Sequence, residues 1–249
     1  LSSQKIKIPQ NEIAFFYGER MFSVSSDTLV LKEYDSDGKM LWMYMLPCHV
    51  SAFAANETIT VVGFVNGDII ILDHKGNELS STRVGGSRIE IILGLAVSTS
   101  GKYIAAITGI DEQRLVVFER GQKNYRVIKH KYLKSNFRNQ VNIYITSDEC
   151  YILYKDISGI GVFGIANSED TMLSIPAEKF YVYQGSPLLG ICLVTDFMQE
   201  RTVHVIKLPD NIIGRIKLPQ NSTYFYLNDD IMFFDDGSGI AAIFFKWGK

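Results

Sequence analysis

Two internal repeats constrain the fold of this chain more than any other feature of its sequence. Residues 34–41, Tyr-Asp-Ser-Asp-Gly-Lys-Met-Leu, align without gaps on residues 72–79, Leu-Asp-His-Lys-Gly-Asn-Glu-Leu, and residues 118–122 are a degenerate third copy. In a turn, Asp accepts hydrogen bonds from nearby backbone N–H groups, and Gly supplies the positive φ that a hairpin requires. Each copy therefore predicts a strand, a tight turn and a second strand.

The second repeat joins the two ends of the chain. Residues 6–11, Ile-Lys-Ile-Pro-Gln-Asn, match residues 216–221, Ile-Lys-Leu-Pro-Gln-Asn. The C-terminal copy runs out one strand short of a full repeat, whereas the N-terminal copy begins with a strand that has no preceding partner. We therefore expect residues 5–8 to pair with the strand near residues 240–245, which would close a ring of sheets.

Short runs with period-two alternation, bounded by Gly, Asp, Asn or Ser, recur along the chain, and no stretch of twelve residues carries a clean helical stripe. These features predict an all-β fold: one six-bladed β-propeller domain with four-stranded antiparallel blades, the N-terminal strand closing the last blade. The alternatives are a β-sandwich or two smaller all-β domains. The expected blades are residues 9–47, 48–87, 88–132, 133–176, 177–218, and 219–249 together with 1–8.

Three segments resemble known propeller repeats. Residues 35–42, which end in Trp42, and residues 67–76 look like the pyrroloquinoline-quinone-type repeat, and residues 96–105 are similar to a segment of tryptophan–aspartate repeats. The resemblance implies a propeller fold and carries no function with it. We expect Trp42 to pack between the first two blades with its indole N–H hydrogen-bonded, and we predict no bound quinone or other cofactor.

Composition narrows the class of partner. A formal net charge of −2 predicts no general attraction to nucleic acid, and no apolar stretch is long and unbroken enough for a transmembrane helix. The cysteines Cys48, Cys150 and Cys192 lack metal-ligand spacing and are expected to be buried free thiols. The alternative is a disulfide between one pair of them. The chain starts at Leu1 rather than Met, which fits a removed signal peptide or an upstream anchor and favours an extracytoplasmic, envelope-associated location. Asn56 and Asn221 begin glycosylation patterns.

Propellers bind ligands at the mouth of the central channel, where loops between blades meet the loops that follow each blade's second strand. The candidates in the first set of loops are His49, Arg88, Glu90 and Asn139. The second set repeats an Asp, which indicates turn chemistry or, alternatively, a carboxylate ring for calcium. Those positions are Asp27, Asp68, Asp111, Asp156, Asp196, Asp235 and Asp236.

The sequence contains no catalytic signature. The four histidines are dispersed, no nucleophile turn is present, and we predict no catalytic residue and no metal ligand. Residues 159–164, Gly-Ile-Gly-Val-Phe-Gly, superficially match a dinucleotide loop, but tight packing of strand glycines is the better interpretation because no helix follows. The alternative function is a propeller hydrolase or lactonase with a metal at the channel.

A basic run is the best candidate for a partner surface. Residues 120–138 hold seven Lys or Arg and no Asp or Glu. Such a run is either a solvated outer strand and loop or a docking patch for an acidic partner or for lipid head groups. We predict a non-enzymatic interaction or scaffold module, monomeric, that binds a protein partner through Arg126, Lys129, Lys131, Lys134 and Arg138.

Overall fold

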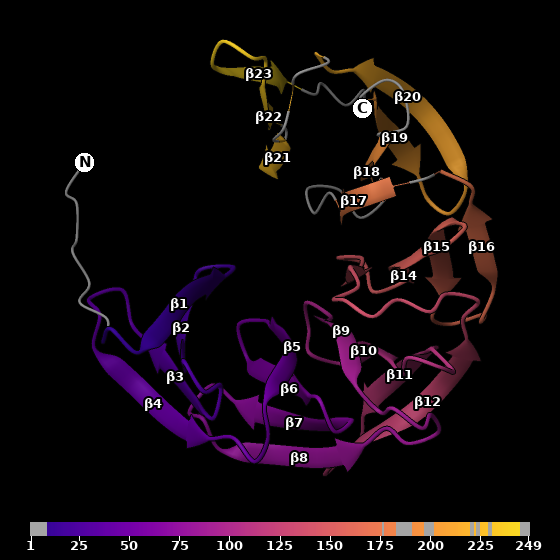
Figure 1. Cartoon of the computed structure of the whole chain (residues 1–249). Coiled ribbons are helices and arrows are strands. Elements are labelled where there is room, and N and C mark those ends of the chain that lie inside the picture. Colours follow the sequence, from indigo (N-terminus) through magenta and orange to yellow (C-terminus); the bar gives the residue numbers. More distant parts are fainter. Residues whose placement is uncertain are drawn as a thin grey trace. The chain divides into compact units, whose positions relative to one another are not determined.

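Every regular element in the described part of the chain is a β-strand (Figure 1). The computed structural model describes residues 9–175, 177–182, 191–196, 202–219, 222, 225–228 and 231–244. These strands form six sheets, five with four strands and one with three, and consecutive strands are neighbours in each sheet. The paired strands are antiparallel. The all-β prediction is therefore confirmed.

The chain divides into two compact units, the first ending at Ile143 and the second starting at Tyr144. The first unit contains three complete sheets. Sheet 1 consists of β1 (Glu12–Tyr17), β2 (Arg20–Ser25), β3 (Val30–Tyr34) and β4 (Met40–Met45). Sheet 2 consists of β5 (Val50–Ala55), β6 (Ile59–Phe64), β7 (Asp68–Asp73) and β8 (Glu78–Arg83). Sheet 3 consists of β9 (Ile92–Val97), β10 (Tyr103–Thr108), β11 (Arg114–Arg120) and β12 (Tyr125–Tyr132).

The remaining sheets follow in chain order. Sheet 4 begins at the unit boundary and consists of β13 (Ile143–Ile145), β14 (Tyr151–Asp156), β15 (Gly159–Gly164) and β16 (Asp170–Leu173). Sheet 5 consists of β17 (Ala177–Val182), β18 (Ile191–Asp196), β19 (Thr202–Lys207) and β20 (Asn211–Lys217). Sheet 6 consists of β21 (Phe225–Asn228), β22 (Ile231–Asp235) and β23 (Ile240–Phe244). The expected strand at residues 5–8 lies outside the described residues.

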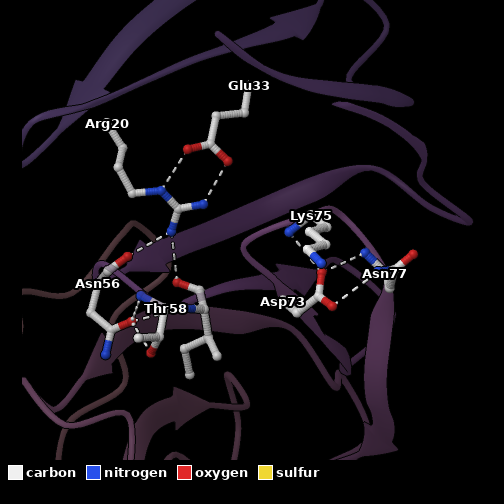
Figure 2. A network of polar contacts seen from close by, with 8 residues as sticks. Arg20, Glu33, Asn56, Thr58, Asp73, Lys75 and Asn77 are labelled. Atoms are coloured by element: carbon white, nitrogen blue, oxygen red, sulfur yellow. Dashed lines mark hydrogen bonds and ion pairs between the residues drawn. The ribbon is translucent and has the colours of Figure 1, made fainter. Parts of the chain in front are cut away.

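The repeated hairpin of sheets 1 and 2 has the predicted turn chemistry. Asp35 Oδ1 accepts hydrogen bonds from the N–H groups of Asp37 and Lys39, at 3.0 and 2.9 Å. Asp73 Oδ1 likewise accepts hydrogen bonds from the N–H groups of Lys75 and Asn77, at 2.8 and 2.9 Å (Figure 2). Gly38 and Gly76 both have a φ of +80°. The repeat seen in the sequence is therefore one turn built twice.

The two inner strands of sheet 2, β6 and β7, are buried on both faces within the first unit. All six residues of β6 are buried, and one face joins a cluster with Phe22 and Leu31 of sheet 1. The other face joins a cluster with Ile92 and Leu95 of sheet 3. Gly63 lies on that side, where a Cβ would come within 2.6 Å of Ile92. Apolar and polar residues do not alternate along β6, because both faces of this strand pack against neighbouring sheets.

Trp42 packs between sheets 1 and 2, as the sequence predicted. Its side chain is 7% exposed and lies against Gly76, where an added Cβ would come within 2.7 Å of the indole. The prediction for its N–H is wrong, because Nε1 has no hydrogen-bond partner among the described residues. Gly76 lies in the turn that follows β7 and brings its backbone against the Trp42 indole, so this contact is packing without a hydrogen bond to Nε1.

A part-buried polar network ties the first three sheets together on the side of the β1–β2 turn, and Figure 2 shows its contacts between sheets 1 and 2. Arg20 Nε and Nη2 donate to the two carboxylate oxygens of Glu33 at 2.7 and 2.6 Å, and Nη1 donates to the carbonyls of Asn56 and Ile59. Asn56 Nδ2 continues the chain of bonds to the carbonyl of Ser98 at 2.9 Å. Asn56 Oδ1 in turn accepts the N–H groups of Thr58 and Ile59, both at 2.8 Å, so the asparagine of this glycosylation pattern shapes the β5–β6 turn.

The glycine run of β15 is packing, not a cofactor loop. Gly161 lies against the ring of Tyr154, which is fully buried and donates a hydrogen bond to Asp170 Oδ1 at 2.7 Å. A Cβ at Gly159 would overlap the carbonyl of Leu173. Both contacts confirm the prediction of strand glycines in a tightly packed sheet.

The cysteine prediction is partly wrong. Cys150 is exposed, because it lies in the turn before β14 rather than inside the strand, and Cys48 is half-buried. Both are free thiols, whereas the Cys192 side chain lies outside what the structure describes. The described residues include no helix that is long and apolar enough to cross a membrane.

Candidate interaction surfaces

The two predicted sets of loops do meet along one side of the first unit. The N–H of Leu46, in the loop after sheet 1, bonds to the carbonyl of Leu29 in the β2–β3 turn at 2.8 Å. The N–H of Val84 bonds to the carbonyl of Gly67 at 3.1 Å. Before β9 the direction is reversed, since the N–H of Gly109, in the turn after β10, donates to the carbonyl of Ile91 at 2.9 Å. Each loop between sheets is therefore anchored to the turn that follows a second strand.

His49 lies on this side of the first unit and is exposed. Its Nδ1 is 3.0 Å from Thr28 Oγ1 and 2.9 Å from the carbonyl oxygen of Asp27. The Asp27 carboxylate accepts hydrogen bonds from the Ser25 hydroxyl and the Leu29 N–H, which lower its pKa below the ordinary value. Both residues thus shape the β2–β3 turn.

Glu90 belongs to a separate cluster above the β6–β7 turn. Arg83 Nε donates to Glu90 Oε2 at 2.9 Å, and Arg83 Nη2 donates to the carbonyl of Asn66 at 3.2 Å. The carboxylate of Asp68 is 3.9 Å from the same guanidinium. A Cβ on Gly67 would come within 2.7 Å of the Glu90 backbone and side chain, which explains why the turn carries glycine with φ +87°.

Arg88 pairs with the next turn along the chain. Its Nε donates to Asp111 Oδ2 at 2.9 Å, and the Ser87 hydroxyl donates to the other oxygen. These two donors hold the pKa of Asp111 well below its ordinary range, with the Ser87 bond the larger cause. Asn139 lies in the exposed loop after β12. The four candidates of the channel mouth therefore have different neighbours, and no contact between them is observed in the described residues.

Three more of the repeated aspartates accept hydrogen bonds from backbone N–H groups in their own turns. Asp156 accepts from the N–H of Ser158 at 3.0 Å, Asp235 from Gly237 at 2.8 Å, and Asp236 from the N–H of Ser238 at 2.8 Å. Asp196 lies where side chains are not described. Among the described residues, no group of three or more His, Cys, Asp or Glu is arranged to hold a metal ion.

The basic run forms the outer strand β12 of sheet 3 and the loop that follows it. Arg126 is 74% exposed, and Lys134 and Arg138 are exposed in the loop. Lys129 and Lys131 are half-buried rather than fully exposed, since they share one face of the strand. Figure 1 shows β12 as the outermost arrow of sheet 3.

Sequence reasoning missed one acid that faces this run. Arg126 lies opposite Glu119 across the β11–β12 hairpin, with Nη2 3.2 Å from Oε2, and Lys102 approaches the same carboxylate at 3.6 Å. Glu119 directly precedes Arg120, the first residue of the basic run, and was therefore not counted among the charges of the run. The hairpin turn around Gly121 was the signal that would have paired the two side chains.

Comparison with known proteins assigns the class. Residues 3–249 match a protein family described as beta-propeller protein, and the chain belongs to that family. An uncharacterized protein of Treponema pallidum (strain Nichols) is 24% identical over 160 residues, which is 64% of this chain and 42% of that protein. The chain thus spans less than half the length of this curated relative.

Solved structures agree on the fold. BamB from Moraxella catarrhalis has a TM-score of 0.60 and 16% identity over 92% of this chain and 70% of its own. A chain of the complex of KlAtg21 with the coiled-coil of AgAtg16 has a TM-score of 0.65 and 12% identity over 84% of this chain and 72% of its own. A chain of the mitotic checkpoint complex has a TM-score of 0.67 and 10% identity over 95% of this chain and 78% of its own.

Proposed function

We propose that this chain is a non-enzymatic propeller that binds a protein partner through strand β12 and the loop after it. The docking surface consists of Arg126, Lys129, Lys131, Lys134 and Arg138. The observation that carries the proposal is the concentration of seven Lys or Arg between residues 120 and 138, on an outer strand and its loop, in a chain whose net charge is −2. A local field of this kind attracts an acidic surface and orients it on approach.

The polar groups of the loop side support this choice. Arg83, Arg88 and Glu90 are each occupied in ion pairs with neighbouring loops, and His49 contacts the β2–β3 turn. Side chains engaged in this way hold the loops in place. Arg126 is paired in the same way with Glu119, so the proposal rests on the density of positive charge along β12 and its loop. A hydrolase would instead need a nucleophile or a metal-activated water presented to a substrate.

The proposed architecture is a ring of six blades closed by the N-terminal strand. The six sheets, the three described strands of sheet 6 and the repeat shared by residues 6–11 and 216–221 support it. Closure would remove an edge strand that otherwise invites aggregation.

The comparisons support a protein partner, because two of the similar folds come from solved structures of complexes. We propose a monomeric propeller that acts outside the cytoplasm, either alone or within a larger assembly. Cell fractionation with an antibody against the chain tests the location, and sedimentation of the purified protein tests the oligomeric state.

The experiment for the docking surface uses charge reversal. The variant Lys129→Glu/Lys131→Glu/Lys134→Glu should lose a partner that the wild-type protein captures by cross-linking from cells of its source. The control Lys39→Glu/Lys75→Glu/Lys207→Glu makes the same change in net charge at three exposed lysines elsewhere and should retain it. Equal capture by both variants would contradict the proposal.

A further inference from the structure

Strand β4 is an outer edge that lacks the usual protection against strand pairing. It is the last strand of sheet 1, and no described strand pairs with its free side. Its six residues, Met-Leu-Trp-Met-Tyr-Met, carry no charge. The outer strands of the other four-stranded sheets, β8, β12, β16 and β20, each contain at least one charged residue. Natural proteins commonly use such charges to keep another strand from adding to an edge.

The side chains of β4 separate by face. Trp42 and Tyr44 point to the cluster shared with sheet 2. Leu41, Met43 and Met45 lie on the opposite face and are 54%, 52% and 65% exposed. An apolar stripe therefore runs beside the unpaired backbone groups of the same strand.

Packing against a neighbouring sheet does not account for this stripe. The equivalent strand of sheet 2 is β8, and its Ser81 pairs with Ile70, on the face of sheet 2 that packs against sheet 1. Ser81 and Arg83 nevertheless stay exposed. Outer-strand positions thus remain accessible even where a neighbouring sheet covers the inner part of the same face.

We propose that β4 accepts an extended, apolar segment of a protein partner as a fifth strand of sheet 1. The free N–H and C=O groups of β4 supply main-chain hydrogen bonds, and alternate apolar side chains of the segment pack on Leu41, Met43 and Met45. Methionine adapts its shape to different partners, which suits a surface that binds a strand by its pattern rather than by one sequence. This site is separate from the basic surface on β12.

The size of the site favours a peptide segment over a second copy of the chain. Stable protein–protein interfaces typically involve roughly 20–30 residues on each side. β4 offers six residues, of which three form the stripe. Main-chain pairing with a single extended strand fits this area, whereas a stable dimer needs more.

The test uses fluorescence polarisation with a labelled peptide, Lys-Thr-Val-Thr-Val-Thr-Val-Lys, and a matched peptide in which the central Thr and the Val after it are both Pro. Neighbouring residues of a strand direct their N–H groups to opposite sides, so one of the two Pro always removes an N–H that would face β4. We expect saturable binding of the first peptide and none of the second, because Pro cannot complete the ladder. Met43→Lys and, independently, Met45→Lys should weaken binding at least tenfold. Ser81→Lys, at the exposed equivalent position on β8, should leave it unchanged.

Absence of saturable binding to the wild-type protein, or equal binding by Met43→Lys and Met45→Lys variants that melt like the wild type, would overturn the proposal. Sedimentation velocity tests the alternative that a second copy of the chain occupies β4. A wild-type dimer that Met43→Lys converts to monomer would show that a second copy occupies β4, and the proposed peptide site would then be wrong.

Discussion

At the scale of single residues, Gly161 of β15 leaves room for the ring of Tyr154, its partner on the paired strand β14. Any side chain there would overlap the ring of Tyr154, whose hydroxyl is fixed by Asp170. Gly161→Ala should lower the free energy of unfolding by about 1–3 kcal/mol, the usual cost of overpacking a filled core. Chemical denaturation measures it.

The matched control is Gly239→Ala, because no heavy atom of the described residues, its two chain neighbours apart, lies within 4 Å of a Cβ at that position. It should unfold like the wild type. A Gly161→Ala protein that is as stable as this control would contradict the packing described for β15.

Arg20 and Glu33 form the second residue-scale test. Their side chains are 14% and 7% exposed. Removing one partner of a buried pair typically costs about 3–5 kcal/mol, because the other charge is left uncompensated. Arg20→Met should show a loss of this size in chemical denaturation.

The double variant Arg20→Met/Glu33→Met should recover much of that loss, since it removes both charges. If the two single substitutions are simply additive in the double variant, Arg20 and Glu33 are not coupled, and the loss in Arg20→Met then comes from its bonds to the Asn56 and Ile59 carbonyls (Figure 2).

At the scale of elements, sheet 1 carries a pH-dependent contact on the face that bears the β4 stripe. Burial raises the pKa of Glu12, but hydrogen bonds from Lys32, Ser23 and Tyr34 together bring it below its ordinary value of 4.5. A carboxyl whose pKa is lower in the folded state stabilises the protein above its unfolded-state pKa, and this stabilisation is lost as the pH falls through the folded-state pKa.

Glu12→Gln should therefore lose less stability than the wild type between pH 7 and pH 3, as measured by urea denaturation at each pH. An identical loss in both proteins would show that Glu12 does not contribute to acid sensitivity.

The elements also show which features could be read from the sequence. The hairpins at Asp35 and Asp73 were predicted because the acceptor and its donors lie within four residues. The Arg20–Asn56 contact joins residues thirty-six positions apart, so nothing local indicates it. Cys150 looked buried because the apolar run after it is a strand, and one residue of difference at the start of β14 placed it in a turn.

The candidate site was predicted in outline only. The sequence pattern correctly placed the loops between sheets beside the turns after second strands, since strand order determines that. It did not predict that Arg83 would pair with Glu90, or Arg88 with Asp111, because those pairings depend on how each loop crosses to the next sheet.

At the scale of the whole molecule, closure of the ring by the N-terminal strand is a prediction that rests on the repeat shared by the two ends. Deleting residues 1–8 should lower the melting temperature and cost several kcal/mol, because it would expose the edge of β23. A truncated protein that melts like the intact one would rule out this closure.

The central claim is that the basic surface on β12 steers a partner by its charge. The most direct measurement is the association rate of that partner across a salt titration. We predict that the wild-type rate falls as salt rises, because the Debye length shortens to about 8 Å at physiological ionic strength. The variant Lys129→Glu/Lys131→Glu/Lys134→Glu should associate more slowly and with a flatter salt dependence. Association at the wild-type rate at every salt concentration would contradict the account and leave β12 as a solvated strand.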